Sequence, residues 1–267
     1  MTDPFPNRII CMTEETTETL YLLGEQDRIV GISGFTVRPP EARKEKPRVS
    51  AFTSAKIDKI MALKPDLVLG FSDLQADIAA DLIRRGISVH IFNHRSIQEI
   101  LEMMIMLGSM VGVQEKAMTW VSQFERQCAD MKALSPPGIK KPIVYFEEWS
   151  DPIITGIQWV SEIIELAGGE DCYPEHSKEP LAKNRIVADP LDVIDKQPDI
   201  IIGSWCGRKF RPDQVLAREG WKNIPAVKNN AVFEIKSSVI MQPGPAALTD
   251  GLDQMKHIID NWHSKSE

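Results

Sequence analysis

The segment "KPDLVLGFSD" (64–73) has a near copy later in the chain, "QPDIIIGSWC" (197–206). Each copy has a Pro-Asp pair, a run of branched apolar residues, a Gly, and then polar or aromatic residues. A short apolar run bounded by Pro and Gly is typical of a buried strand. The repeat predicts that the chain builds the same strand element twice, once in each of two similar parts.

Short strand-like runs alternate with helical patterns around both copies. Around the first copy we expect strands at 8–12, 28–33, 66–71 and 88–93, and helices at 16–23, 56–63 and 74–86. Around the second we expect strands at 142–147, 199–204 and 231–236, helices at 158–167, 190–196, 212–219 and 246–263, and a polar loop at 170–185. Strands that are apolar on both faces and separated by helices indicate a parallel sheet covered on both sides.

Between the two alternating regions the pattern stays helical, from Ser96 to about Leu134, with Gly112 as a candidate break and "SPPG" (135–138) as the stop. The predicted fold is therefore α/β, with two lobes that contain parallel sheets and are joined by a single long helix. We expect an N-terminal lobe at 1–96, a bridging helix at 97–135 and a C-terminal lobe at 136–267.

Composition restricts the function. In 267 residues, 43% are hydrophobic and 26% are charged, as in soluble globular proteins of one large or two ordinary domains. The net charge of −7 argues against a nucleic-acid partner, because binding phosphates needs an excess of positive charge. The longest apolar stretch, "ILEMMIMLGSMVGV" (100–113), is too short to span a membrane and contains Glu102, so we expect no membrane insertion.

The cysteines and the N-terminus bear on the compartment. The four cysteines form no Cys-x-x-Cys pair, and free thiols are compatible with a reducing compartment. The opening "MTDPFPNRIICM" (1–12) has neither the basic nor the apolar region of a signal peptide. As it stands, the sequence predicts a cytoplasmic protein; a periplasmic protein is expected instead if a leader peptide has been removed.

Candidate ligand-binding residues follow the predicted strands. Ligands of open α/β sheets bind beyond the carboxyl ends of the strands, so two facing lobes would line one cleft. The set is unusually rich in charges and large rings, although loops are often polar because they are wet, and Glu at the start of a helix is favoured by the helix dipole. The predicted ligand-binding residues are Glu14, Glu15, Phe35, Arg38, Phe52, Phe71, Asp73, Asn93, Arg95, Glu147, Trp149, Trp159, Trp205 and Lys236.

Catalytic and metal-binding motifs are weak. The chain contains no Gly-x-Ser-x-Gly, Walker-type phosphate loop or His-Glu-x-x-His. Cys206 could act as a nucleophile with Lys209 nearby, but a buried structural thiol is the favoured interpretation. Cys172 and His176 are spaced like a metal pair on a helix, but the segment contains Pro and is typical of a loop. We expect no resident metal, no cofactor and no catalytic residue.

The chain resembles the solute-binding proteins of ABC importers that carry cobalamin and ferric siderophores, and the cobalamin-binding branch is the most similar. The resemblance covers nearly the whole chain and rests on the order and spacing of several phrases. They are "RIICMTEETTETLYLLGEQDRIVGISG" (8–34), "RPPEARKEKPRVS" (38–50), "KIDKIMALKPDLVLG" (56–70), "IQEILEMMIMLGSMVGVQEKA" (97–117), "WVSEIIELAGGED" (159–171), "IPAVKNNAVFEI" (224–235) and "PGPAALTDGL" (243–252). It implies two Rossmann-like lobes bridged by a rigid helix.

The resemblance also implies site residues and shows departures. Phe52 and Phe71 fall where cobalamin binders place tryptophans, and Arg38 falls where a tyrosine is expected. Corrin amides are neutral, whereas the predicted site also includes charged residues such as Lys236 and Glu147. Because an unpaired buried charge costs several kcal/mol, these charges should meet either one another or a charged ligand.

The resemblance implies a permease partner, met by one acidic residue on each lobe. Asp58, in "KIDKI", falls at the first such position, and Glu219 lies one residue from the second; Asp58 is equally well explained as an exposed helix acid. We expect a monomer that binds cobalamin or a related corrinoid as a solute-binding or carrier protein. Two alternatives stay open: a binder of a ferric chelate or other charged small molecule, and a cytosolic enzyme that uses Cys206 or the Glu147/Glu148 pair.

Overall fold

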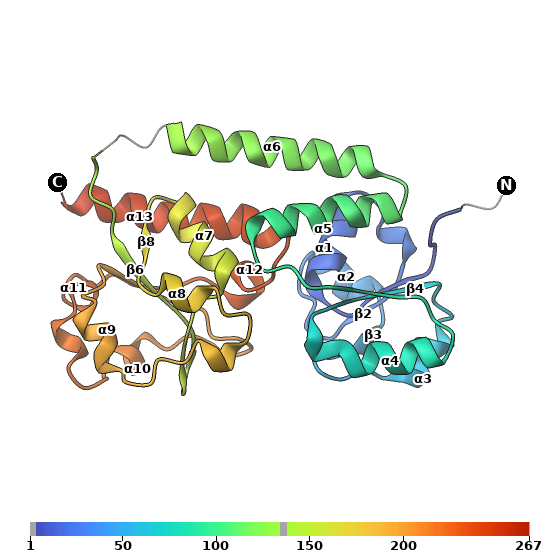
Figure 1. Ribbon diagram of the computed structural model, residues 1–267, viewed down its shortest axis with the longest axis horizontal. Coiled ribbons are helices and arrows are strands. Elements are labelled where there is room, and N and C mark those ends of the chain that lie inside the picture. The colour runs from blue at the N-terminus through green and yellow to red at the C-terminus, as the bar shows by residue number, and fades with distance from the viewer. Residues whose placement is uncertain (1–3, 134–137, 267) are drawn as a thin grey trace. The chain divides into compact units, whose positions relative to one another are not determined.

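The computed structural model describes residues 4–133 and 138–266. They form two compact units, each with its own sheet (Figure 1). The N-terminal unit comprises the described parts of Met1–His94, Gln98–Phe124 and Pro243–Pro245, and the C-terminal unit those of Arg95–Ile97, Glu125–Gln242 and Ala246–Glu267. The short segment Pro243–Pro245 thus packs within the N-terminal unit, although the chain on either side of it belongs to the C-terminal unit.

The N-terminal unit is built on a parallel sheet, as predicted. The strands are β1 (Ile9–Cys11), β2 (Ile29–Ser33), β3 (Arg48–Ser50), β4 (Leu67–Phe71) and β5 (Val89–Phe92), in the order β3-β2-β1-β4-β5. Every pair in this order is parallel. The direction of winding reverses between β1 and β4, and this is the position at which open α/β sheets bind their ligands.

Helices cover both faces of the N-terminal sheet. They are α1 (Glu14–Leu22), α2 (Pro40–Glu45), α3 (Ile57–Ala62), α4 (Ala76–Arg84) and α5 (Ile97–Met110). Helices α1 and α5 lie on one face of the sheet, and α3 and α4 lie on the other (Figure 1). Apolar side chains of the sheet meet those of α3 and α4 in a buried cluster that includes Met12, Ile60, Val68 and Leu82. Burial of these side chains holds the strand ends of this unit in place.

The C-terminal unit has a mixed sheet. The strands are β6 (Ile143–Ser150), β7 (Ile153–Thr155), β8 (Glu170–Asp171), β9 (Ile200–Gly203) and β10 (Val232–Glu234). Strand β6 pairs in parallel with β8 and β9, and β9 pairs in parallel with β10. The pairing of β6 with β7 is antiparallel, so the prediction of a parallel sheet holds for this unit except for this hairpin.

The helices of the C-terminal unit are short apart from the last. They are α7 (Gln158–Leu166), α8 (Pro174–Ser177), α9 (Leu191–Asp195), α10 (Pro212–Leu216), α11 (Pro225–Lys228), α12 (Ser237–Ile240) and α13 (Leu252–Ser266). A π-helical turn at Ala247–Gly251 leads into α13. The prediction of a loop over 170–185 is wrong in part, because this segment contains β8, α8 and the 3-10 turn Ala182–Asn184.

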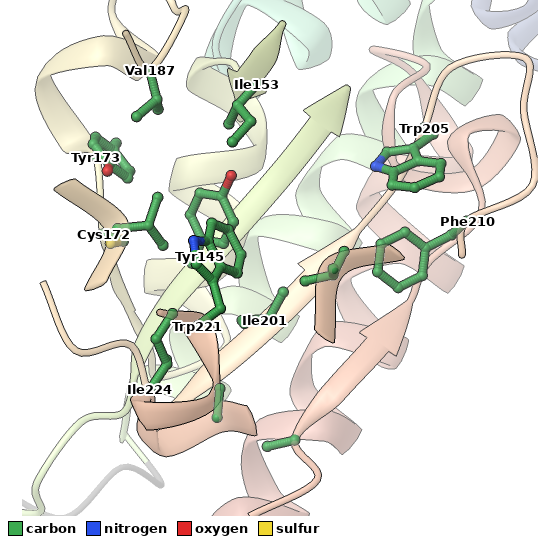
Figure 2. Close-up of a cluster of buried hydrophobic side chains, with 14 residues drawn as sticks. Tyr145, Ile153, Cys172, Tyr173, Val187, Ile201, Trp205, Phe210, Trp221 and Ile224 are labelled. Atoms are coloured by element: carbon green, nitrogen blue, oxygen red, sulfur yellow. The ribbon is translucent and has the colours of Figure 1, made fainter. Parts of the chain in front are cut away.

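The core of the C-terminal unit is strongly aromatic. Figure 2 shows Tyr145, Tyr173 and Trp221 gathered in one part of the cluster, and Trp205 and Phe210 lying against each other in another. The ring centroids of Trp205 and Phe210 are 5.1 Å apart in an edge-on arrangement, which is favourable for aromatic pairs. Trp205 and Phe210 anchor the chain that follows β9.

The repeated segment predicted from the sequence forms equivalent structures. Strand β4 lies between β1 and β5, and β9 lies between β6 and β10. The Asp of each copy fixes the start of the neighbouring strand: the Asp66 carboxylate accepts hydrogen bonds from the N–H groups of Asn7 and Arg8, and that of Asp199 accepts one from the N–H of Ile143. The same sequence motif therefore sets the pairing of a central strand in both units.

The segment predicted to be one bridging helix is two helices. Helix α5 ends at Met110 and α6 (Gln114–Ala133) begins four residues later. The break falls at Gly112, the predicted candidate, which has a φ of +78° that glycine adopts without strain. The division between the units falls within α6, after Phe124. The "SPPG" stop lies largely outside the described residues, since only Gly138 of it is described.

Candidate ligand-binding site

The switch point of the N-terminal sheet carries two buried acids. Glu14 and Glu15 are the first residues of α1, directly after β1 and the N-cap residue Thr13, whose hydroxyl donates to the Glu15 carboxylate. Burial raises the pKa of the Glu14 carboxyl to about 7 and that of Glu15 to about 8. Around neutral pH, therefore, both groups are partly or mostly protonated, and this strand end carries less negative charge than its sequence suggests.

The segment that inserts from the C-terminal half packs on these acids. A Cβ on Gly244 would lie 2.6 Å from Cβ of Glu15, so only glycine fits at this position. The neighbouring Pro243 carbonyl is 2.7 Å from Nε2 of the buried His94. Gly244 and Pro243 are thus part of the wall of the N-terminal strand ends, which the sequence pattern did not indicate.

The three predicted phenylalanines of the N-terminal unit differ in exposure. Phe71 is 7% exposed and packs edge-on against His94, with ring centroids 5.0 Å apart. Phe52 is half-buried, and its carbonyl accepts a hydrogen bond from Nε2 of Gln75. Phe35 is 55% exposed. Phe35 is therefore the ring most available to a ligand, whereas Phe71 contributes mainly to the core.

The polar candidates of the N-terminal strand ends also differ in exposure. The Arg38 guanidinium donates through Nε to Glu18 Oε1 at 3.1 Å, so an acid one turn beyond Glu14 and Glu15 pairs with it. Asp73 and Asn93 are exposed. Arg95, which belongs to the C-terminal unit, is half-buried.

In the C-terminal unit, Glu147 is fully buried in β6, at the last residue that pairs with β9, and is surrounded by donors. Arg218 binds it with two hydrogen bonds, Nη1 to Oε2 at 2.5 Å and Nη2 to Oε1 at 2.9 Å. Tyr145 Oη donates to Oε2 at 2.8 Å and Trp205 Nε1 donates to Oε1 at 2.9 Å. Four hydrogen bonds and an ion pair compensate the buried charge of Glu147, as such a charge requires.

The next residue along β6 has its own arginine. Glu148 Oε2 accepts from Arg185 Nη1 at 2.6 Å, and the Arg185 side chain, which is 2% exposed, also donates to the Thr155 carbonyl. Arg185 and Arg218 were absent from the predicted site. No sequence signal identifies them, because each lies in a loop far along the chain from its partner.

The three predicted tryptophans have different environments. Trp159 is buried, and its Nε1 donates to the Ile240 carbonyl at 2.9 Å. Trp205 is buried against Phe210. Trp149 is half-buried, with Nε1 bonded to the Asp151 carbonyl at 2.8 Å and the Arg208 guanidinium 5.0 Å from its ring centroid. Of these three tryptophans, Trp149 is therefore the one whose ring is accessible enough to contact a ligand.

Lys236 and Cys206 are both exposed. Cys206 is exposed rather than buried, so the expectation of a buried structural thiol is wrong. Cys172 is buried, and burial raises the pKa of its thiol to about 12, which disfavours the thiolate that binds metals. Within residues 4–133 and 138–266, no group of three or more His, Cys, Asp and Glu side chains is placed to hold a metal ion.

The chain belongs to the periplasmic binding protein family, whose model matches residues 9–239. It is thus a solute-binding protein. It is 27% identical over 255 residues to the vitamin B12-binding protein of Vibrio parahaemolyticus, covering 94% of this chain and 88% of that protein. It is 24% identical over 271 residues to the uncharacterized ABC transporter substrate-binding lipoprotein YvrC of Bacillus subtilis, covering 95% of this chain and 80% of that one.

Solved structures share the fold. The periplasmic heme-binding protein RhuT of Roseiflexus sp. RS-1 superimposes with a TM-score of 0.78 at 21% identity, covering 95% of this chain and 99% of that chain. The names of these similar proteins describe binding proteins rather than enzymes. Among the residues that the structure describes, no helix combines the length and apolar character needed to cross a membrane.

Proposed function

We propose that the protein binds cobalamin or a related corrinoid through the strand-end residues of its units. The observation that carries the proposal is the pairing of the charges at these strand ends. Arg38 pairs with Glu18, Glu147 with Arg218 and Glu148 with Arg185. The sequence left two possibilities for the predicted charges: they meet each other or a charged ligand. Arg38, Glu147 and Glu148 each have a partner within the protein.

The buried acids of the N-terminal unit support the same ligand class. Since burial raises the pKa of Glu14 and Glu15 to about 7 and about 8, this strand end carries little negative charge near pH 7. Neutral carboxyls and paired ions suit the neutral amide groups at the edge of a corrin. Phe35 and Trp149 would supply ring contacts. The similarity to a vitamin B12-binding protein points in the same direction.

A ferric chelate such as heme is the second candidate. The observation that favours it is the presence of exposed cations, Arg208 and Lys236, after the strands of the C-terminal unit, since such groups suit ligand carboxylates. The similarity in fold to a heme-binding protein is compatible with this candidate.

We further propose delivery of the ligand to an ABC permease, as the name of the Bacillus subtilis relative suggests, and hence a location outside the cytoplasm. Asp58, in the first turn of α3, and Glu219 are both exposed and so are available for docking to basic residues of such a permease. The binding protein itself would act as a monomer.

Equilibrium dialysis against a mixture of equal concentrations of hydroxocobalamin and hemin separates the two candidates. The absorbance spectra of the two compounds identify which is retained. The proposal expects retention of cobalamin. Retention of hemin alone would favour the second candidate, and retention of neither would refute both.

A further inference from the structure

The loop Ser204–Arg211, which follows β9, is held firmly at two points. Trp205 is buried, and its Nε1 donates to Glu147 at 2.9 Å. Phe210 packs over Gly203 so closely that a Cβ on that glycine would lie 1.9 Å from the ring. Figure 2 shows Trp205 and Phe210 lying against each other at the base of this loop. The residues between them, including Arg208, are therefore presented from a fixed base.

The Arg208 side chain is exposed but oriented. Its guanidinium carbon lies 5.0 Å from the centroid of the Trp149 ring and 5.6 Å from that of Trp205. Cation–π contacts at these distances are attractive and restrict the side chain. An arginine oriented before binding loses less conformational entropy when a ligand arrives.

The hydrogen-bonding capacity of Arg208 is unused. Within the described ranges 4–133 and 138–266, its guanidinium makes no hydrogen bond or ion pair with another residue. Arg185, Arg211 and Arg218, the other arginines near this strand end, are all engaged with carboxylates. Contacts with aromatic rings do not consume the N–H donors of Arg208, which a planar guanidinium presents in a fork that suits phosphate or carboxylate oxygens.

We propose that Arg208 binds an anionic oxygen group of the ligand and so determines its orientation. The inference rests on the proposed function and deepens it. In cobalamin, the anionic group is the phosphodiester of the nucleotide loop, which is the sole anionic group on a molecule whose other edge groups are neutral amides. In a heme, the corresponding groups are the propionate carboxylates. One available arginine among paired ones suits a ligand with a single localized negative charge.

The test compares cobalamin with cobinamide, which has the same corrin but lacks the nucleotide loop and its phosphodiester. Calorimetric titrations use the wild-type chain, Arg208→Gln, Arg208→Lys and the control Lys209→Gln, which removes an exposed positive charge one residue away. We expect Arg208→Gln to weaken cobalamin binding about tenfold and Arg208→Lys to restore part of the loss, as for a charge-assisted hydrogen bond in contact with solvent. Cobinamide binding should be unchanged in all variants, and Lys209→Gln should match the wild type.

The outcomes separate this inference from the proposed function. Suppose that the wild-type chain binds both corrinoids and that Arg208→Gln lowers the affinity for both equally, or for neither. Arg208 then does not bind the anionic group, while the corrinoid proposal stands. If the wild-type chain binds neither corrinoid, the proposed function fails and the phosphodiester assignment fails with it. In that case a titration with hemin tests whether Arg208 binds the carboxylate groups of a heme instead. Weaker hemin binding by Arg208→Gln would support the role of Arg208, and unchanged binding would overturn it.

Discussion

Lys64 and Gln197, which occupy the same position in the two copies of the repeated segment, have φ angles of +46° and +48°. Both residues lie in the left-handed region directly before the Pro-Asp pair, where the chain turns from a helix into a central strand. A backbone conformation that L-residues rarely adopt is therefore preserved in both units. The repeat is a structural motif, and the turn is part of it.

Replacement of Lys64 by glycine should stabilise the protein by about 0.5 kcal/mol, because relief of about 1–2 kcal/mol of left-handed strain exceeds about 0.5–1 kcal/mol of added chain entropy. Lys64→Ile should be destabilising, since a β-branched side chain tolerates this conformation least. The control Lys44→Gly, in helix α2, should be destabilising instead. Urea unfolding of the three variants measures these differences. Equal effects of glycine at Lys64 and at Lys44 would show that the left-handed conformation of Lys64 carries no strain.

Arg218→Met should lower the free energy of unfolding by about 3–5 kcal/mol, because it leaves the buried Glu147 carboxylate without its ion-pair partner. The control Arg211→Met breaks a fully exposed ion pair with Asp213 and should leave the unfolding midpoint unchanged. The double variant Glu147→Gln with Arg218→Met should recover part of the loss, since Gln keeps an acceptor for Tyr145 and Trp205. A double variant as unstable as the sum of its parts would show that the two residues are not coupled.

Glu15→Gln should remove a pH dependence of stability. Burial raises the folded-state pKa of Glu15 to about 8, whereas an unfolded chain has a Glu pKa near 4.3. The folded state therefore binds more protons than the unfolded state between these values, and the stability of the wild-type chain falls as pH rises from about 5 to 8. Glu14, whose folded-state pKa is raised to about 7, contributes with the same sign.

The expected result is that Glu15→Gln becomes more stable relative to wild type as pH rises through this window, by on the order of a few kcal/mol at pH 8. Chemical unfolding at pH 5, 6.5 and 8 measures this difference. Glu115→Gln, at the start of α6, serves as the exposed control and should follow the wild type. A constant difference between Glu15→Gln and wild type would mean that Glu15 is ionised throughout.

Phe35→Ala should weaken binding of the corrinoid by about 1–3 kcal/mol, the free energy of one ring that becomes buried in a complex, with little effect on stability. Phe71→Ala should instead destabilise the fold by about 3–5 kcal/mol, because Phe71 is already buried in the free protein. Phe5→Ala is the control, since Phe5 precedes β1 and so lies at the opposite end of the parallel strands. Calorimetry and thermal unfolding of each variant separate the two effects, and a loss of affinity in Phe5→Ala equal to that in Phe35→Ala would contradict the placement.

The sequence predicted most of the fold because its strongest signals are local. The apolar runs and the Gly and Pro residues around them predicted the central strands and most helices to within a few residues. The hairpin strand β7 was missed, because three residues after Asp151 and Pro152 have no recognisable period. The two helices at 97–133 were predicted as one, although the position of the break at Gly112 was identified correctly.

The site was predicted less completely, because its energetics depend on partners far apart in sequence. Glu147 pairs with Arg218 across 71 residues and Glu148 with Arg185 across 37, and neither spacing leaves a pattern. The sequence also cannot distinguish a ring that faces the core from one that faces a ligand. Trp159 and Trp205 follow apolar elements in the same way as Trp149, but in the structure they are buried. Their assignment to the ligand site stays a prediction.

The most direct test of the account is a calorimetric titration of the purified chain with hydroxocobalamin at several temperatures, since the heat of binding can vanish at one temperature. If the chain binds corrinoids, the titration should show saturable binding of one ligand per chain with a dissociation constant of about 1 μM or lower. The absence of saturable heat at every temperature would contradict the corrinoid assignment.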